Sequence, residues 1–405
     1  MISYRARWVL PIAAPPIRDG WVAVDDGRVV GVGAGSPPAG SERIDVGSVA
    51  VMPGLVNAHT HLELSYLRDR VPRASDFISW VRPVIALQRG RSDPSSPEVV
   101  AAIGAAIDES VRSGTAVVGD ISNTLTTFAP LAESPLAAVV FHELIRFNTD
   151  DPDGIVAQAQ RTIDALPATR TVRASLAAHA PYSVAPLVLR AIRAASDADP
   201  RMRCSVHLSE SAEEVEFIRH GGGPWRALLE ELGAWNRSWV PPGGSPVEYL
   251  EACGFLGDRV LAVHGVQMSP ADLEHLAARG VTLVTCPRSN TYTGAGTPPV
   301  EDFYASGVRV AIGTDSLAST PDLNMFAELT AVRALASSVP AARLLDSATR
   351  QGARALGFED EFGTIEPGRS ARLIAVAIPA GVEDVEEYLV GGIEPDRVRW
   401  LESEI

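Results

Sequence analysis

The stretch "MPGLVNAHTHLELS", residues 52–65, decides the fold of this chain. A Pro-Gly pair leads into a short apolar run, and the run ends in two histidines one residue apart, His59 and His61. Along a strand, residues two positions apart point to the same side, so both imidazoles can face one metal ion. Such a pair by itself fits a structural role equally well, and only its place in the chain decides between the two.

Seven more apolar runs rich in Val, Ile and Ala follow, and segments with helical spacing such as "SPEVVAAIGAAIDESVRSG" and "SPADLEHLAARG" lie between them. Each run carries a His, Asp, Glu or Asn at its carboxyl end. The eight runs read "AVMPGLVNAHTH", "GTAVVGDIS", "LAAVVFHEL", "TVRASLAAHAP", "MRCSVHLSE", "RVLAVHGVQ", "GVTLVTCPRSN" and "VRVAIGTDS". Strands that alternate with helices predict a parallel sheet, and eight such units predict an α/β fold of the (β/α)8 TIM-barrel type, with the polar strand ends at its catalytic face. A doubly wound open sheet would also tolerate the alternation, but it would not gather eight strand ends around one pocket.

The two ends of the chain follow a different pattern. The segment "WVAVDDGRVVGVG" predicts a hairpin around Asp25, Asp26 and Gly27, and "FGTIEPGRSARLIAVAIP" returns to short strands around a Pro-Gly turn. We therefore expect residues 1–51 and 362–405 to form one small β-sandwich domain, and residues 52–361 to form the barrel.

Composition excludes several classes of protein. The 405 residues carry a formal charge of -15 and no run of basic residues, which disfavours nucleic acid and anionic membranes as partners and favours a small molecule. No apolar stretch approaches the ~20 residues that span a bilayer. Prolines interrupt the N-terminal apolar patch, so we interpret it as mature protein rather than a signal peptide. The three cysteines indicate no disulfide framework, and we expect a cytoplasmic protein.

The chain contains no lysine, so all 35 basic residues are arginine. Schiff-base chemistry, a phosphate-binding P-loop lysine and a carbamylated lysine that bridges two metals are all excluded. The sequence therefore favours a site with a single metal ion, although a Glu or Cys bridge between two metals stays open.

Other strand ends supply the remaining candidate ligands. His207 ends the fifth run, and Asp315 ends the eighth, which lies beside the first where a barrel closes. Three histidines and one aspartate fit Zn2+ or Fe2+ with a position left for water. Glu210 follows His207 by three residues, and His264 ends the sixth run, where it can orient that water without being a ligand. His142 stays open between a site and a core residue, whereas His220 and His275 lie in polar, helix-like surroundings.

These motifs carry a family resemblance over nearly the whole length. In their order, "PGLVNAHTHLE", "HAPYSV", "HLSE", "VHGV", "CPRSN", "GTDS" and "GTIEPGRSARL" resemble the amidohydrolase superfamily, in its cytosine deaminase-like branch with the chlorohydrolases and adenosine-type deaminases. The resemblance implies one divalent ion, Zn2+ or Fe2+, on His59, His61, His207 and Asp315, with Glu210, His264 and Asp315 as catalytic residues. It also implies a possible homodimer. Arg372 departs from the pattern, because the family commonly has Asp there.

Glutamate in H-x-x-E indicates deamination of an aromatic ring, because amide hydrolysis leaves no ring nitrogen to protonate. The chain most resembles aminodeoxyfutalosine deaminases of menaquinone biosynthesis, which act on an adenine nucleoside bearing a benzoate. Arg82, Arg146 and Arg288 are candidates for binding its carboxylate. The expected substrate contacts are Glu63, Tyr66, His179, Tyr182, Arg146, Arg288 and Asn290, and Trp80 is either a pocket wall or helix packing.

Several alternatives stay open. They are S-adenosylhomocysteine/methylthioadenosine deaminase, guanine deaminase, chlorohydrolase, imidazolone-type amidohydrolase and, from another class, a metal-binding protein without enzymatic activity.

Overall fold

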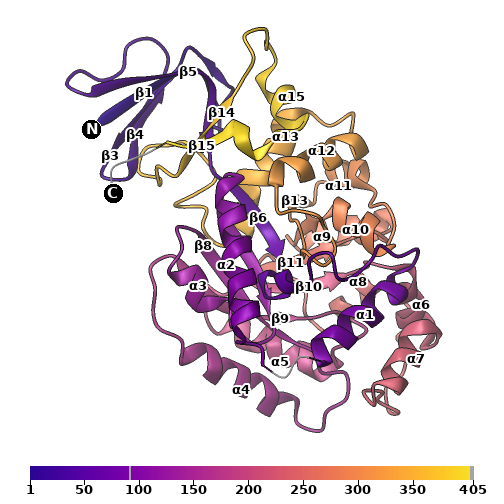
Figure 1. Cartoon of the computed structure of the whole chain (residues 1–405). Coiled ribbons are helices and arrows are strands. Elements are labelled where there is room, and N and C mark those ends of the chain that lie inside the picture. The colour runs from indigo at the N-terminus through magenta and orange to yellow at the C-terminus, as the bar shows by residue number, and fades with distance from the viewer. Residues whose placement is uncertain (91–92, 402–405) are drawn as a thin grey trace.

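The computed structural model describes residues 1–90 and 93–401. A barrel of parallel strands surrounded by helices forms the larger part, and a mixed sheet built from segments near both ends of the chain forms the smaller part (Figure 1). This arrangement confirms the fold predicted from the alternating runs.

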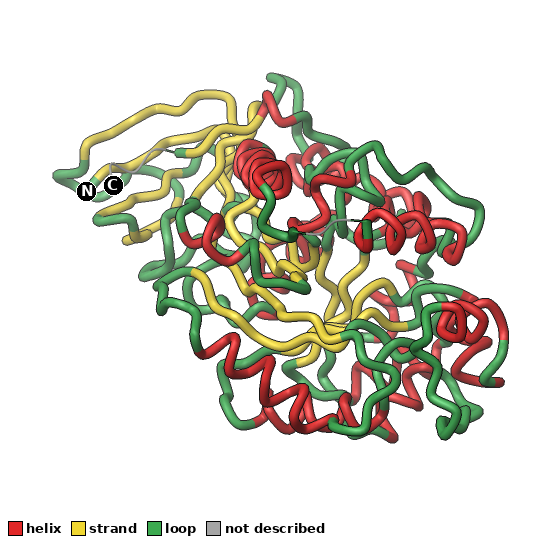
Figure 2. The backbone as a smooth tube through the Cα atoms, turned by 60° about the horizontal axis from the view of Figure 1, so that its bottom comes forward, coloured by secondary structure: helices red, strands yellow, loops and turns green. Residues whose placement is uncertain are grey.

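All eight predicted runs form the strands of the barrel. They are β6 (Leu55–Thr60), β7 (Thr115–Ser122), β8 (Ala137–Leu144), β9 (Val172–Ala178), β10 (Cys204–Leu208), β11 (Val260–His264), β12 (Thr282–Thr285) and β13 (Arg309–Ile312). The strands pair in chain order, and a parallel bridge between Thr60 and Asp315 joins the last strand to the first. In Figure 2 they appear as a ring of yellow strands surrounded by red helices. This closure places the eighth strand end directly beside the first.

Helices cover the outside of the barrel. They are the 3-10 turn η1 (Leu62–Leu67), α1 (Phe77–Arg89), α2 (Pro97–Arg112), α3 (Phe128–Ala132), α4 (Pro152–Asp164), α5 (Pro186–Asp197), α6 (Ala212–His220), α7 (Gly223–Glu231), α8 (Pro246–Ala252), α9 (Pro270–Ala278), α10 (Pro287–Thr293), α11 (Val300–Ser306), α12 (Met325–Leu335), α13 (Ala341–Asp346), the π-helical turn η2 (Ser347–Gln351) and α14 (Gly352–Ala355). Local sequence starts several of them: Ser245 with Glu248, and Ser269 with Asp272, form capping boxes ahead of α8 and α9.

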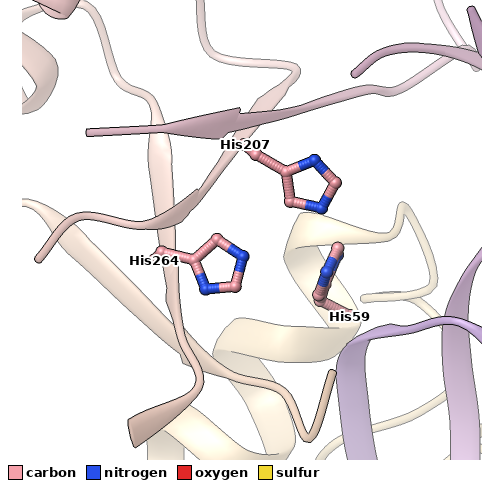
Figure 3. Close-up of side chains that lie close together, drawn as sticks. All are labelled: His59, His207 and His264. Carbon is pink, nitrogen blue, oxygen red and sulfur yellow. The ribbon is translucent and has the colours of Figure 1, made fainter. Parts of the chain in front are cut away.

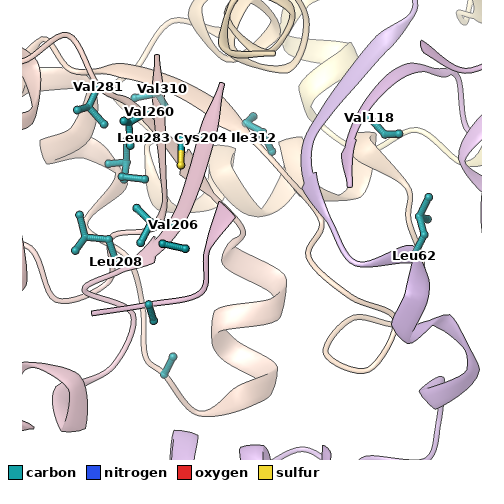
Figure 4. Packing of buried hydrophobic residues seen from close by; sticks show 14 of the residues in the cluster. Leu62, Val118, Cys204, Val206, Leu208, Val260, Val281, Leu283, Val310 and Ile312 are labelled. Atoms are coloured by element: carbon teal, nitrogen blue, oxygen red, sulfur yellow. The ribbon is translucent and has the colours of Figure 1, made fainter. Parts of the chain in front are cut away.

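Alternation along the strands creates two apolar layers. On β11, Val260 and Ala262 belong to the cluster between the strands and the helices, whereas Leu261 and Val263 belong to the cluster inside the barrel. Figure 4 shows the outer layer around Val260, Leu283 and Val310. Each fully buried aliphatic side chain contributes about 1.5–3 kcal/mol, so these layers fix the positions of the strand ends.

The terminal segments meet in one seven-stranded sheet, as expected for a small β domain built from both ends of the chain. Its strands are β1 (Ile2–Val9), β2 (Ile17–Arg18), β3 (Trp21–Asp25), β4 (Arg28–Gly33), β5 (Glu42–Pro53), β14 (Leu373–Ala377) and β15 (Val398–Trp400), with α15 (Val385–Val390) and η3 (Pro395–Arg397) between the last two. The predicted hairpin is present, with Asp26 and Gly27 in the left-handed region.

A single residue, Gly54, separates β5 from the first barrel strand. A Cβ atom at this position would lie 2.6 Å from the Cβ of Ala116 and 2.9 Å from the Trp400 ring. Glycine therefore allows the small sheet to pack directly against the barrel.

In the described part of the chain, no helix combines the length and the apolarity needed to cross a membrane. Cys204, Cys253 and Cys286 are all buried and unpaired by disulfides, as expected from the sequence.

Candidate active site

Four histidines and one aspartate converge at the carboxyl end of the barrel. The Nε2 atoms of His59 and His61 lie 3.2 Å apart, and they lie 3.6 Å and 3.4 Å from Oδ1 of Asp315. His207 and His264 point from the neighbouring strands β10 and β11 toward His59 (Figure 3). Residues spread over more than 250 positions of the sequence therefore form one cluster.

The donor atoms of this cluster fit a divalent cation. The Nδ1 atom of His207 lies 2.8 Å from the carbonyl oxygen of His179, so Nδ1 carries the proton and Nε2 keeps a free lone pair. Imidazole nitrogens with a carboxylate oxygen are the ligands that Zn2+ and Fe2+ accept. His59, His61, His207 and Asp315 are therefore the residues that would hold the ion.

Burial keeps the imidazoles of His61, His207 and His264 neutral, which is the form that can bind a metal ion. It lowers the pKa of His61 and of His264 to about 3, and the pKa of His207 falls well below its usual range for the same reason. Burial also pushes the pKa of Asp315 upward, but its hydrogen-bonding contact with His59 and its electrostatic interactions with His61 and His264 outweigh this effect and hold that pKa well below the usual range. An ionised carboxylate beside neutral imidazoles suits a cation.

Unusual backbone geometry brings two of these side chains to the site. His264 has φ 81° and Asp315 has φ 62°, both in the left-handed region that non-glycine residues rarely occupy. Gly313 allows the last strand to approach the first, because a Cβ there would lie 2.7 Å from the carbonyl oxygen of His59. Local strain and close packing therefore position the carboxylate.

Glu210 lies on the loop after β10, with Oε1 at 3.5 Å from Nε2 of His264. Burial raises the pKa of its carboxyl well above the usual range. The fully buried Glu214 holds this loop, because its carboxylate accepts the backbone N–H groups of Ser209 and Glu210 at 2.9 Å and 2.8 Å. Ser209 is itself left-handed at φ 52°.

Helix α10 contributes two adjacent side chains that hold the cluster. The Ser289 hydroxyl donates to Oδ2 of Asp315 at 2.5 Å, and Nδ2 of Asn290 lies 3.0 Å from Nδ1 of His264. Asn290 is fully buried behind His264 and does not line the cavity described next. In this structure Asn290 supports a histidine, and its expected contact with the substrate stays a prediction.

A cavity of about 560 Å³, here the metal-side cavity, opens from this cluster. His61, His207, His264, Asp315 and Glu210 line it, together with His179, Tyr182 and Arg146, three of the residues expected to contact the substrate. Its other wall is apolar and comes from α1 and α7, through Phe77, Trp80, Val84, Trp225, Leu228 and Leu229. Tyr182 stacks on Trp225 with ring centroids 3.7 Å apart. Because Trp80 lines this cavity, it is a pocket wall.

A second cavity of about 720 Å³, here the polar cavity, lies beside the first between β7, β8 and α4. The two share the lining residues Gln88, Asn123, Glu143, Ile145 and Arg146. His142 lines the polar cavity, half-buried, whereas His220 is exposed and His275 pairs with Glu251 near the surface.

Three further predicted contacts lie elsewhere. Glu63 lines only the polar cavity, and its carboxylate accepts hydrogen bonds from Ser122 and Thr124. Turn η1 carries Tyr66 into the apolar core. Arg288 binds Asp322 through two hydrogen bonds, away from both cavities, because α10 directs it toward α12. Arg82 pairs with Glu231 at the surface.

Sequence reasoning missed Glu143 and the apolar wall. Glu143 directly follows His142 near the end of β8, so the strand-end rule that selected the histidines could have found it. The residues of α7 carry no local signal, because Trp225 and Leu228 have the spacing of any amphipathic helix.

Comparison with known proteins places these residues in context. The sequence model of the Amidohydrolase family matches residues 50–393. The 5-methylthioadenosine/S-adenosylhomocysteine deaminase of Moorella thermoacetica is 31% identical over 413 residues, which cover 96% of this chain and 90% of that protein. The aminodeoxyfutalosine deaminase of Deinococcus radiodurans is 32% identical over 342 residues, covering 80% and 77%. The crystal structure of an adenosine deaminase from Xanthomonas campestris with bound zinc matches with a TM-score of 0.82 and 30% identity, covering 98% and 90% of the two chains.

Proposed function

This chain belongs to the amidohydrolase family, and we propose that it removes the amino group from an adenine nucleoside extended at its 5′ position, with aminodeoxyfutalosine as the preferred substrate. Family and relatives make it a hydrolytic deaminase that acts on a C–N bond. The metal-side cavity carries the finer proposal, because an apolar wall and an arginine suit an aromatic tail that ends in a carboxylate.

A divalent ion held by His59, His61, His207 and Asp315 would supply the acidity that turns water into a nucleophile near neutral pH. We infer Zn2+ or Fe2+ from the donor set, and zinc is bound in the Xanthomonas campestris structure. The missing lysine favours a single ion.

Glu210 is placed to move the proton that the reaction needs. Because burial raises the pKa of its carboxyl and so favours the protonated form, Glu210 can donate to a ring nitrogen of the purine as the adjacent carbon becomes tetrahedral. Ionised Asp315 accepts a proton from the attacking water, and His264 orients that water from the opposite side. Asp315 then passes its proton to the amino group, the tetrahedral carbon collapses to a carbonyl with release of ammonia, and the remaining hydroxyl proton returns to Glu210.

The apolar wall selects the 5′ substituent in this proposal. Phe77, Trp80 and Trp225 offer ring faces and edges to an aromatic group. The Arg146 guanidinium lines the same cavity and donates to the carbonyl oxygen of Ile145, with no carboxylate partner among the described residues. It is free to bind a carboxylate of the substrate.

A second candidate reaction is the deamination of methylthioadenosine or S-adenosylhomocysteine. The relatives favour it, because the Moorella thermoacetica protein is named as a deaminase of these two compounds. Methylthioadenosine has the apolar tail without the carboxylate, so the two candidates differ in their dependence on Arg146.

Steady-state ammonia release separates the candidates when the zinc-loaded enzyme is given adenosine, methylthioadenosine, S-adenosylhomocysteine, aminodeoxyfutalosine and guanine. We expect the highest kcat/KM for aminodeoxyfutalosine. Arg146→Ala should lower that value about 10-fold and leave methylthioadenosine unaffected, whereas the surface control Arg82→Ala should change neither. A preference for guanine or a chlorotriazine contradicts the proposal.

A further inference from the structure

Glu143 is a buried carboxylate with one oxygen unused. Its side chain is 3% exposed, and its Oε2 accepts a hydrogen bond from Nδ2 of Asn123 at 2.8 Å. Its Oε1 has no hydrogen-bond partner within the described residues. Leaving a buried carboxylate oxygen unpaired is costly, so this atom is expected to have a partner in the working enzyme.

Neighbouring groups do not supply that partner. Oε1 lies 3.7 Å from Nδ1 of His207, but this nitrogen already points its proton at the carbonyl oxygen of His179. Glu143 therefore does not orient His207. A second metal ion on Glu143, His179 and His207 would need either Nδ1 of His207, which donates to the carbonyl oxygen of His179, or Nε2, which the proposed ion uses.

The position of the free oxygen points to the sugar of the substrate. Glu143 lines both cavities at their junction, and the imidazole of His207 separates it from the metal cluster. An adenine whose amino carbon faces that cluster projects its ribose away from the metal, toward the shared wall of the two cavities. Resting on the proposed function, we propose that Oε1 of Glu143 accepts a hydrogen bond from a ribose hydroxyl and makes the enzyme selective for ribosides.

The hydrogen-bonding chemistry of a carboxylate and a ribose hydroxyl supports this assignment. An ionised carboxylate only accepts hydrogen bonds, and a ribose hydroxyl can donate one while its own oxygen stays available to other groups. A hydrogen bond to a charged group typically changes affinity about 10- to 100-fold. Asn123 fixes the carboxylate through its other oxygen, so the acceptor is already oriented before the substrate arrives.

The test measures each enzyme variant on two nucleosides, one with the ribose hydroxyls and one without them. Wild type, Glu143→Gln and Glu143→Met are compared on adenosine and 2′,3′-dideoxyadenosine, by kcat/KM and by inhibition constants against the best substrate of the panel. On adenosine we expect Glu143→Met to lose about 10- to 100-fold and Glu143→Gln to lose less, since an amide still forms hydrogen bonds. On the dideoxy analogue all three enzymes should agree within about threefold.

Metal content and Tm of each variant are measured as well, and Glu133→Gln, the same chemical change at an exposed residue, serves as the control. Equal losses on both nucleosides, or a loss of metal, would assign Glu143 to the metal site and overturn the inference. The inference is also overturned if the Glu143 variants discriminate between the two nucleosides as strongly as wild type does. If wild type deaminates no adenine nucleoside at all, the proposed function fails first, and the two failures are thereby distinguished.

Discussion

At the scale of single residues, the site depends on side chains whose protonation the surrounding protein sets. Glu210 and Asp315 are both carboxyl groups, yet burial raises the pKa of one, and the histidines around the other hold its pKa low. Two carboxyl groups with pKa values pushed apart can act as acid and base in one reaction. Asn290 and Ser289 belong to the same scale, because each contacts one of the proposed catalytic residues.

Glu210→Gln removes the transferable proton while keeping the volume of the side chain. We expect kcat to fall by about 10²- to 10⁴-fold, the usual contribution of a proton-transfer residue. Metal content and Tm should stay near wild type, because Glu210 is not among the proposed ligands. A variant that loses metal would instead identify Glu210 as part of the metal site.

Glu328 predicts a pH dependence of stability. Burial raises its pKa to about 8, although Arg288 opposes the shift, and its ordinary pKa is 4.5. The folded protein therefore binds a proton there that the unfolded chain has released, and stability falls as the pH rises from about 4.5 to about 8. Glu328→Gln should remove this contribution, at most about 1.4 kcal/mol per pH unit.

The measurement is urea unfolding of wild type and Glu328→Gln at several pH values. The difference in free energy of unfolding should shift in favour of the variant as the pH rises. A constant difference between pH 5 and pH 8 would show that Glu328 titrates normally.

At the scale of elements, short segments after the strands determine the geometry of the site. The loop after β10 places Glu210, and the first turns of α6 hold that loop through Glu214. Helix α10 likewise holds the residues at the ends of β11 and β13 by hydrogen bonds, from Asn290 to His264 and from Ser289 to Asp315. These contacts are backbone and side-chain hydrogen bonds at full burial, so their loss is expensive.

Glu214→Leu leaves the N–H groups of Ser209 and Glu210 without their acceptor. We expect a fall in the free energy of unfolding of about 2–4 kcal/mol, from two unsatisfied buried donors, and a fall in kcat of at least about 10-fold. Glu214→Gln keeps one acceptor oxygen and should recover part of both losses. If Glu214→Leu destabilises the protein but leaves kcat intact, the loop is held by other contacts.

At the scale of the whole molecule, barrel closure joins the first and last strands beside the proposed metal site. Thr60 and Asp315 form the closing bridge, and His59 and His61 lie on either side of Thr60. An ion bound here connects β6, β10 and β13 in addition to its chemical role. Its binding therefore contributes to the stability of the fold.

Removing the metal with a chelator should abolish deamination and lower Tm. An ion present at 100 times its Kd contributes about 2.7 kcal/mol to the free energy of unfolding. Adding Zn2+ or Fe2+ back should restore both properties, and the His59→Ala variant should show the low Tm with or without added metal. An unchanged Tm after verified metal loss would contradict this coupling.

Local sequence determined the strand order and the candidate metal ligands. Apolar runs that each end in a polar residue are visible in the sequence, and a closed barrel necessarily brings their carboxyl ends together. The substrate side was less predictable: His179, Tyr182 and Arg146 reach the cavity, but Tyr66, Arg288 and Asn290 do not. Their positions depend on turns and helices that carry no comparable pattern.

The sequence by itself therefore determined a TIM barrel with His59, His61, His207 and Asp315 at its mouth, because spacing along a strand is a local property. Only the tertiary structure decided which faces of α1 and α7 close the pocket and that Glu143 presents a free oxygen to it. The physical reason is that side-chain direction and burial follow from how distant elements pack, and packing is settled by the whole chain.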